Sequence, residues 1–291
     1  MKKIWIIITV VVIGCATCVL KRYLDIPKVS VVMLTYQRAS YLTQSMDSIL
    51  TQTYPDFEFI ILNDGSTDNT DAVVAKYHDK RIRYYKNPKN MGISYSRNRA
   101  ADLARGKYIM IMDDDDVSLP VRMEKQVQYL DEHPDVAAVT GQIVGFYRII
   151  NNHDTLAYGL LNYNSFGNGN VMYRRNFARK HNIQYDEKLS AWEDRKFWID
   201  FWFAGAKFGA IDEDILVCRT KNAKYYSGDG VKLHQMINTY IGNLIEPEKP
   251  EIYLNADECQ KIKLLETQNI LSENFINNKK NEYCSTQTTK R

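Results

Sequence analysis

The chain has 291 residues, of which 45% are hydrophobic, and its 38 Lys and Arg against 35 Asp and Glu give a formal net charge of +3 at pH 7. This length and composition support a sizeable core in one large domain or two small ones. The near balance of charge, without a basic stripe, excludes the usual electrostatic footprint of a nucleic-acid binder, so no nucleic-acid partner is expected.

An uncharged apolar stretch covers residues 4–20, between paired basic residues at 2–3 and 21–22. A helix of this length spans about 26 Å, slightly less than a hydrocarbon core of roughly 30 Å, and flanking lysines can extend to the interface. We expect residues 1–24 to form a single-pass N-terminal membrane anchor; a cleaved signal peptide and a lipoprotein signal ending at Cys15 are the alternatives. The side of the membrane is not predicted, because positive charge is nearly equal at the two ends.

The cysteines do not indicate a disulfide framework, because their number is odd and their spacing wide. The five are Cys15, Cys18, Cys218, Cys259 and Cys284. Cys15 and Cys18 form a C-x-x-C inside the apolar stretch with no βαβ pattern around them. Neither a redox role nor a zinc role is therefore expected for this pair.

After the linker at residues 25–27, apolar runs alternate with segments of helical spacing. Unbroken apolar and β-branched runs predict buried strands at residues 28–34, 57–62, 81–85, 108–112 and 136–140. Apolar residues at helical spacing predict helices at residues 41–51, 72–77, 93–104 and 121–130. This alternation predicts a parallel, doubly wound sheet with right-handed crossovers.

From Gly141 onward the pattern is less regular. We expect a strand-like segment at 141–150, a loop-rich segment at 151–170, a strongly apolar helix at 192–205 and two short strands at 207–211 and 215–219. The tail at 246–291 is polar, with one exposed helix expected at 256–276 and disorder after it.

Four adjacent carboxylates, Asp113–Asp116, follow the apolar strand at residues 108–112. Neighbouring anions repel one another and lower stability unless a cation or solvent absorbs the charge. A solvated acidic turn is one interpretation. Ligands in open α/β sheets, however, bind at the carboxyl ends of strands, and hard divalent cations prefer oxygen ligands. The position of the cluster therefore favours a metal site.

Several sequence blocks together resemble the family 2 glycosyltransferases with the GT-A nucleotide-sugar-binding fold. The blocks are residues 29–70, 90–120 (ending in "MDDDDVSLP"), 171–175 ("VMYRR") and 185–198 ("YDEKLSAWEDRKFW"). The resemblance covers about residues 28–220 and implies a Rossmann-like, mostly parallel α/β sheet flanked by helices. It implies a glycosyltransferase domain at 25–245, with a nucleotide-binding half at 25–140 and an acceptor-binding half at 141–245.

The resemblance also implies the residues that hold the donor nucleotide. They are the turn after the first strand, with Thr35, Tyr36 and Arg38, and Asp64 after the second strand. A carboxylate at Asp64 suits the imino N–H of uracil. The alternative for the "NDGSTD" segment is an ordinary turn with a helix N-cap.

Aligned on the family's D-x-D motif, Asp113 and Asp115 face a metal ion, and Asp114 lies between them at a position assigned to the nucleotide sugar. The ion, Mn²⁺ or Mg²⁺, would bridge the diphosphate of a nucleoside diphosphate sugar and stabilise the departing nucleotide. Arg97 would neutralise phosphate charge, with a surface ion pair as the alternative. Further candidates for the diphosphate or the acceptor are Arg219, which matches a family position, and Arg174 and Arg175.

Glu193 and Asp194 open the apolar helix. By resemblance Asp194 is the general base and Glu193 orients the acceptor or Asp194; the alternative is that the helix dipole favours carboxylates in a first turn. We thus expect an inverting, metal-dependent transfer from a UDP-sugar to a hydroxyl of a glycan, a lipid-linked sugar or a glycoprotein. A non-catalytic nucleotide-sugar or glycan-binding protein is an alternative. A sugar nucleotidyltransferase is another, although "LTYQRAS" lacks its Gly-rich loop.

Overall fold

The computed structural model describes residues 26–146, 149–162, 164–219, 229–246, 256–267 and 271–284. Within these ranges no helix combines the length and the apolar character that crossing a membrane requires. The anchor expected at residues 1–24 lies outside the described residues.

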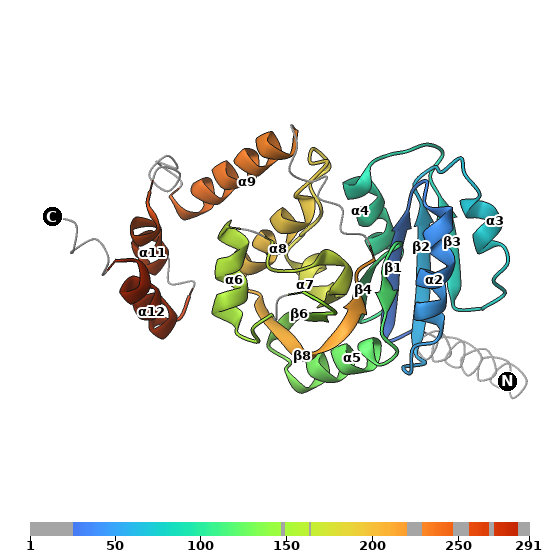
Figure 1. Cartoon of the computed structure of the whole chain (residues 1–291), viewed down its shortest axis with the longest axis horizontal. Helices are drawn as coiled ribbons and strands as arrows, with labels where there is room; N and C mark the ends of the chain where they lie inside the picture. Colours follow the sequence, from blue (N-terminus) through green and yellow to red (C-terminus); the bar gives the residue numbers. More distant parts are fainter. Residues whose placement is uncertain are drawn as a thin grey trace, which may run out of the picture.

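A single sheet forms the centre of the described chain (Figure 1). Its strands are β1 (Val29–Thr35), β2 (Phe57–Asn63), β3 (Ile82–Lys86), β4 (Tyr108–Asp113), β5 (Val117–Ser118), β6 (Val136–Ile143), β7 (Met172–Arg174) and β8 (Lys207–Val217). Their order across the sheet is β3-β2-β1-β4-β7-β6-β8-β5.

The sheet is mixed, although most of its pairs are parallel. The pairs among β3, β2, β1 and β4 are all parallel, as the sequence predicts, and so is the pair of β6 with β8. Strand β7 runs antiparallel to both β4 and β6, and β5 runs antiparallel to β8. The mostly parallel sheet that the sequence predicts is therefore confirmed, and the antiparallel direction of β7, outside the first 140 residues, follows because the chain enters this strand from the carboxyl edge of β4.

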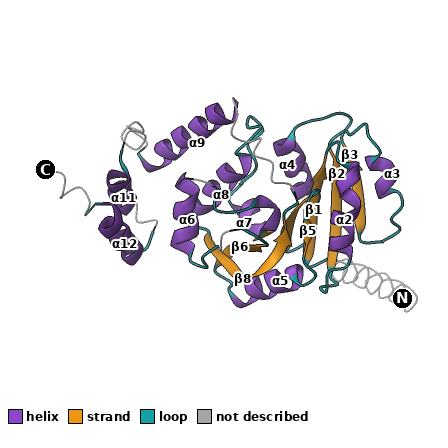
Figure 2. Ribbon diagram, in the orientation of Figure 1, coloured by secondary structure: helices purple, strands orange, loops and turns teal. Residues whose placement is uncertain are grey.

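Helices cover both faces of the sheet (Figure 2). The helices of the described residues are α2 (Ala39–Leu50), α3 (Thr70–Val74), α4 (Ile93–Leu103), α5 (Arg122–Glu132), α6 (His153–Asn162), α7 (Arg175–Lys180), α8 (Glu193–Phe203), α9 (Asp229–Ile245), α11 (Glu258–Thr267) and α12 (Glu273–Tyr283), of which α11 and α12 lie beyond α6, away from the sheet. Residues Asn168–Asn170 form a 3₁₀ turn, η1.

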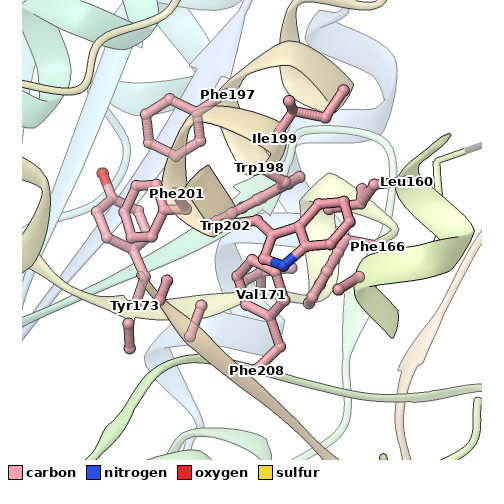
Figure 3. Packing of buried hydrophobic residues seen from close by; sticks show 14 of the residues in the cluster. Leu160, Phe166, Val171, Tyr173, Phe197, Trp198, Ile199, Phe201, Trp202 and Phe208 are labelled. Atoms are coloured by element: carbon pink, nitrogen blue, oxygen red, sulfur yellow. The ribbon is translucent and has the colours of Figure 1, made fainter. Parts of the chain in front are cut away.

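The strands divide their side chains between two apolar layers, as the alternation of side chains along a strand requires. Val31 and Met33 of β1 pack in the layer that includes residues of α2 and α5. Val32 packs in the layer that includes residues of α4, α6 and α8. Figure 3 shows the aromatic part of this second layer, where Phe166, Trp198 and Phe208 meet.

Two expectations for the second half of the chain are corrected. The segment predicted as loop-rich contains α6, whose Leu156, Leu160 and Leu161 are buried. The two short strands expected at 207–219 are one strand, β8, with irregular pairing to β6. A bulged strand loses the uniform alternation on which the sequence prediction relied.

The polar tail is more ordered than predicted. Its described residues, 256–267 and 271–284, contain two helices, α11 and α12, where one exposed helix was expected at 256–276, and Cys259 and Cys284 join them through a disulfide bond. The prediction that the cysteines form no disulfide is wrong for this pair. The tail also contacts α6, where Tyr158 donates a hydrogen bond to Glu258 at 3.0 Å.

Two glycines with similar, positive φ angles allow the cost of backbone strain to be compared with the cost of a steric clash. Gly65 (φ +75°) follows β2, and a Cβ there would lie 2.3 Å from the backbone carbon of Lys89; Gly205 (φ +87°) has nothing within 4 Å of such an atom. We predict that Gly205→Ala lowers the free energy of unfolding by about 1 kcal/mol. Gly65→Ala should lower it by about 3 kcal/mol, because the clash is with backbone. Urea unfolding measures both, and equal losses would contradict the steric argument.

Candidate active site

A cavity of about 640 Å³ opens at the carboxyl ends of β1, β2 and β4. Its wall on the other side comes from the start of α8 and the loop between α6 and β7. Ten of the thirteen predicted site residues line it: Thr35, Tyr36, Arg38, Asp64, Arg97, Asp113, Asp114, Asp115, Glu193 and Asp194. Asp115 and Asp194, which are 79 positions apart in the sequence, therefore share one cleft.

The turns after β1 and β2 hold each other. Gln37 lies at φ +56°; its N–H donates to the Ser66 hydroxyl at 3.0 Å, and its side-chain oxygen accepts the Asp68 N–H at 3.1 Å. This contact fixes Thr35 and Tyr36 beside the end of β2. The "NDGSTD" segment thus forms a structural turn, as the alternative interpretation proposed, but without the expected side-chain N-cap of α3, and its Asp64 lines the cavity.

Asp64 is buried at the cavity wall, where it organises the loop before α4. Its carboxylate accepts hydrogen bonds from the Asn87 side chain at 2.6 Å and from the N–H groups of Met91 and Gly92 at 2.9 and 3.1 Å. A carboxylate has about four acceptor sites, so these three bonds leave one for a ligand.

The backbone of the acidic turn is fixed by α2. The Ser45 hydroxyl bonds to the carbonyl oxygens of Asp114 at 2.7 Å and Asp116 at 2.6 Å. Arg219 donates through Nε to the Asp115 carbonyl at 2.7 Å and through its own N–H to Asp116 Oδ1 at 3.2 Å. These bonds hold the Asp113 and Asp115 carboxylates at the cavity.

Three arginines predicted as ligands do not line the cavity, and their ligand roles stay predictions. Arg219 is not among the residues that line the cavity, because its guanidinium is bonded to α2 and to the acidic turn. Arg174 donates to the carbonyls of Val136, Leu130 and His133, and Arg175 to those of Gly106, Ala104 and Arg105. Since β7 is antiparallel, Arg174 pairs with Tyr108, at the amino end of β4 and away from the site.

The donor set suits a hard divalent cation. Asp113 and Asp115 both line the cavity. The Asp115 carboxylate already contacts a positive group, because the guanidinium of Arg38 lies against its Oδ2 atom. In the described part of the chain, no three His, Cys, Asp or Glu side chains converge on one ion position. A cation held by two carboxylates would take its other oxygen ligands from a diphosphate and from water.

Arg97 links the acidic strand to the start of α8. Its guanidinium is buried, forms an ion pair with Glu193 and lies 4.0 Å from Asp113 Oδ1. It also lies over the Tyr185 ring, 5.2 Å from the centroid. The alternative of a surface ion pair is therefore wrong, since both partners are buried.

Asp194 is held in the first turn of α8. Its Oδ2 accepts a hydrogen bond from Asn164 Nδ2 at 2.8 Å, and its Oδ1 accepts the N–H of Arg195 at 2.8 Å. Trp192, the residue immediately before Glu193 and Asp194, lines the cavity, and its backbone is left-handed at φ +62°. Such a conformation is strained for a bulky side chain and is maintained by the surrounding structure.

Burial raises the pKa of four carboxyl groups of the site above the ordinary value. Burial, with the charge of Glu193 adding to it and Arg97 opposing it, raises the pKa of Asp194 to about 7. Burial also raises the pKa of Asp114 to about 7 and that of Asp116 to about 6, and it raises the pKa of Asp113. Beneath the turn, burial lowers the pKa of Arg122 to about 9.

Sequence reasoning missed several side chains of the cavity. Asn164, Asn168, Tyr185 and Trp192 all line it. Asn168 is buried, and its Nδ2 has no hydrogen-bond partner in the described structure. The sequence signal for Asn164 and Asn168 was the Asn- and Gly-rich composition of residues 162–170. This composition indicates a loop, but it does not show which strands the loop crosses.

The curled, mostly parallel sheet with a cavity at its carboxyl edge defines an α/β protein of the GT-A type. TarS residues 1–349 from S. aureus, solved in complex with UDP-GlcNAc, has a TM-score of 0.63 at 21% identity over 82% of this chain and 70% of that one. The mannosyltransferase PcManGT from Pyrobaculum calidifontis, solved with GDP-Man and Mn²⁺, has a TM-score of 0.55 at 19% identity over 76% and 64%. At these identities the likeness concerns the fold alone.

The chain belongs to glycosyl transferase family 2, whose sequence model matches residues 30–193. An uncharacterised glycosyltransferase of Methanocaldococcus jannaschii is 35% identical over 220 residues, which span 70% of this chain and 74% of that protein. The family confirms the resemblance found in the sequence, and it disfavours a sugar nucleotidyltransferase.

The raised pKa of Asp194 gives a prediction for stability. A carboxyl whose pKa is raised by folding stabilises the fold below its unfolded pKa of 3.8, and this contribution is lost as pH rises through about 7. Asp194→Asn, which stays neutral, should therefore raise the melting temperature by about 2–4 °C at pH 8, a gain of about 1 kcal/mol. At pH 4 it should change it little. Calorimetry at both pH values measures this, and a loss at pH 8 would contradict the buried-charge argument.

Proposed function

We propose that the protein is an inverting, metal-dependent glycosyltransferase that moves a sugar from a nucleoside diphosphate, UDP in the first instance, to a hydroxyl acceptor. The acceptor would be a glycan, a lipid-linked sugar or a glycoprotein. The observation that carries the proposal is that one cavity brings together the acidic end of β4 and the Asp194 carboxylate of α8. The solved relatives with UDP-GlcNAc and with GDP-Man and Mn²⁺ support a nucleotide sugar as the donor.

In this proposal the nucleotide lies along the ends of β1 and β2. Thr35, Tyr36 and Asp64 line that end of the cavity, and Arg38 extends from the same turn toward the acidic residues. Asp113 and Asp115 would hold the divalent cation, which when bound stabilises negative charge on the diphosphate leaving group. Asn168 Nδ2 offers a hydrogen bond to a neutral oxygen of the bound donor.

Asp194 acts as the general base. Its ionised carboxylate takes the proton of the acceptor hydroxyl while the acceptor oxygen attacks the anomeric carbon. The bond from that carbon to the diphosphate oxygen breaks, and the nucleoside diphosphate leaves with the electron pair. A single displacement inverts the anomeric configuration and needs no covalent intermediate. Glu193 is held by Arg97 beside this base, so it orients the site electrostatically.

Nucleotide release tests the proposal. The full-length chain in mild detergent with Mn²⁺ should release free nucleotide from at least one of UDP-GlcNAc, UDP-glucose, UDP-galactose and GDP-mannose. Asp194→Asn should slow this release by about 100-fold or more, since a general base contributes that much. Asp115→Ala should do the same, because a carboxylate toward the cation is lost. Chelation of the metal by EDTA should abolish release, and added Mn²⁺ should restore it.

Asn278→Ala provides the control, because Asn278 is exposed on α12, outside the cavity lining. It should leave release unchanged. A non-catalytic binding protein would release no nucleotide in the wild-type chain or in any variant. Full activity in Asp194→Asn would reject Asp194 as the base.

The pH dependence of release follows from the same carboxyl. Because the base works only when ionised and its pKa is raised to about 7, kcat/KM at saturating Mn²⁺ should rise with pH through about 7 and then level off. Initial rates between pH 5.5 and 9 measure the profile. A profile already flat from pH 5.5 would show that no group with this raised pKa acts as the base.

A further inference from the structure

The loop between α6 and β7, residues 164–170, forms the wall of the cavity next to Asp194. Its two ends are fixed in different ways. At one end the Asn170 side chain is fully buried and bonds to β6, where it donates to the Gly141 carbonyl at 2.8 Å. At the other end the Ser165 hydroxyl donates to the Leu156 carbonyl in α6 at 2.6 Å. Asn164 therefore lies on a part of the cavity wall whose two ends are held by hydrogen bonds.

The hydrogen bonds of Asn164 define the orientation of its amide. Oδ1 accepts the N–H of Phe166 at 3.3 Å, and Nδ2 donates to Asp194 Oδ2 at 2.8 Å. The flipped amide would place Nδ2 against the N–H donor of Phe166, a contact that is repulsive whatever the protonation state of Asp194. Asn164 is therefore a donor to Asp194.

The helix that carries Asp194 is tied to the last turn of α6 and to the same loop. The buried guanidinium of Arg195 donates through Nε to the Leu160 carbonyl at 2.7 Å and through Nη2 to the Leu161 carbonyl at 2.6 Å, which satisfies carbonyls of the last turn of α6. One turn later, Trp198 packs on Phe166 with ring centroids 5.4 Å apart (Figure 3). The relative position of Asn164 and Asp194 is thus fixed from both sides.

We propose that Asn164 is a positioning residue for Asp194, whose amide holds the Oδ2 atom so that the carboxylate stays ionised and turned toward the acceptor. The inference rests on the proposed role of Asp194 as the general base. The Arg195 N–H fixes the other oxygen, Oδ1. Each oxygen has two acceptor sites, so one on each is left for the incoming hydroxyl. A hydrogen bond donated to a carboxylate favours the anion, and a carboxamide does this without adding charge.

The balance of charge around Asp194 makes this single bond effective. The charged and titratable groups that face it come from α8, α4, β4 and the segment before α8, and they are Glu193, Arg97, Asp113 and Tyr185. Burial, Glu193 and Asp113 raise the pKa of Asp194, whereas Arg97 lowers it. Because the result lies at about 7, the loss of one donor changes the ionised fraction within the working range of pH.

Asn164→Ala and Asn164→Asp test the proposal through the pH profile of nucleotide release, with the nucleotide sugar that the wild type releases fastest. Asn164→Ala should raise the apparent pKa by about one unit. Release should then be about fivefold slower at pH 7 but less than about twofold slower at pH 9, with little change in KM for the donor. Asn164→Asp, which places a second carboxylate beside Asp194, should shift the profile further in the same direction.

A residue with a merely structural role would lower the rate by the same factor at every pH, and that result would overturn the proposal. Asn278→Ala is the matched control and should keep the wild-type profile. If the wild-type chain releases no nucleotide, the proposed function fails, and if Asp194→Asn retains full release, the role of Asp194 as the base fails and the positioning role of Asn164 with it. If Asp194→Asn is inactive and Asn164→Ala keeps the wild-type profile, only the positioning role fails.

A second measurement needs no substrate. A double-mutant cycle of Asn164→Ala and Asp194→Asn, followed by urea unfolding of the full chain, isolates the energy that couples the two side chains. This coupling should be larger at pH 9, where Asp194 is ionised, than at pH 5, where it is protonated. Equal coupling at the two pH values would overturn the claim that Asn164 acts on the anion.

Discussion

The buried guanidinium of Arg97 is the group on which the site depends. It comes from α4, forms an ion pair with Glu193 of α8 and lies close to Asp113 at the end of β4. These elements belong to different halves of the chain, and without a cation between them their carboxylates would repel one another. A buried charge that loses its partner is strongly destabilising. Arg97 therefore stabilises the cleft, because its guanidinium lies close to a carboxylate from each wall, Asp113 and Glu193.

Arg97 does not balance all of the negative charge in the site, and the negative charge that remains fits the chemistry proposed for the site. Burial raises the pKa of Asp113, Asp114, Asp116 and Asp194. A divalent cation at the acidic turn and a proton acceptor at Asp194 both use negative charge that the protein leaves uncompensated. The stability lost there is offset by the two apolar layers of the sheet, in which the largest side chains are fully buried.

The C-terminal tail contributes to the site through a series of contacts. The disulfide joins α11 to α12, and both helices contact α6, through Glu258 with Tyr158 and through Ser272 with Asp154. Helix α6 in turn supports the loop that carries Asn164. Residues of the C-terminal tail therefore support, through α6, the wall of the cavity beside Asp194.

The sequence by itself determined the strands of the first half of the sheet, β1, β2 and β4, and most of the residues that line the cavity. Apolar runs followed by polar turns specify β1, β2 and β4 locally, and because parallel strands share a carboxyl edge, Thr35, Asp64 and Asp113 had to meet there. The family pattern added Asp194. Only the tertiary structure decided the direction of β7, the use of Arg174 and Arg219 as backbone supports, the Cys259–Cys284 bond and the contact of Asn164 with Asp194. These depend on contacts between segments distant in sequence, and neither periodicity nor spacing records which segments those are.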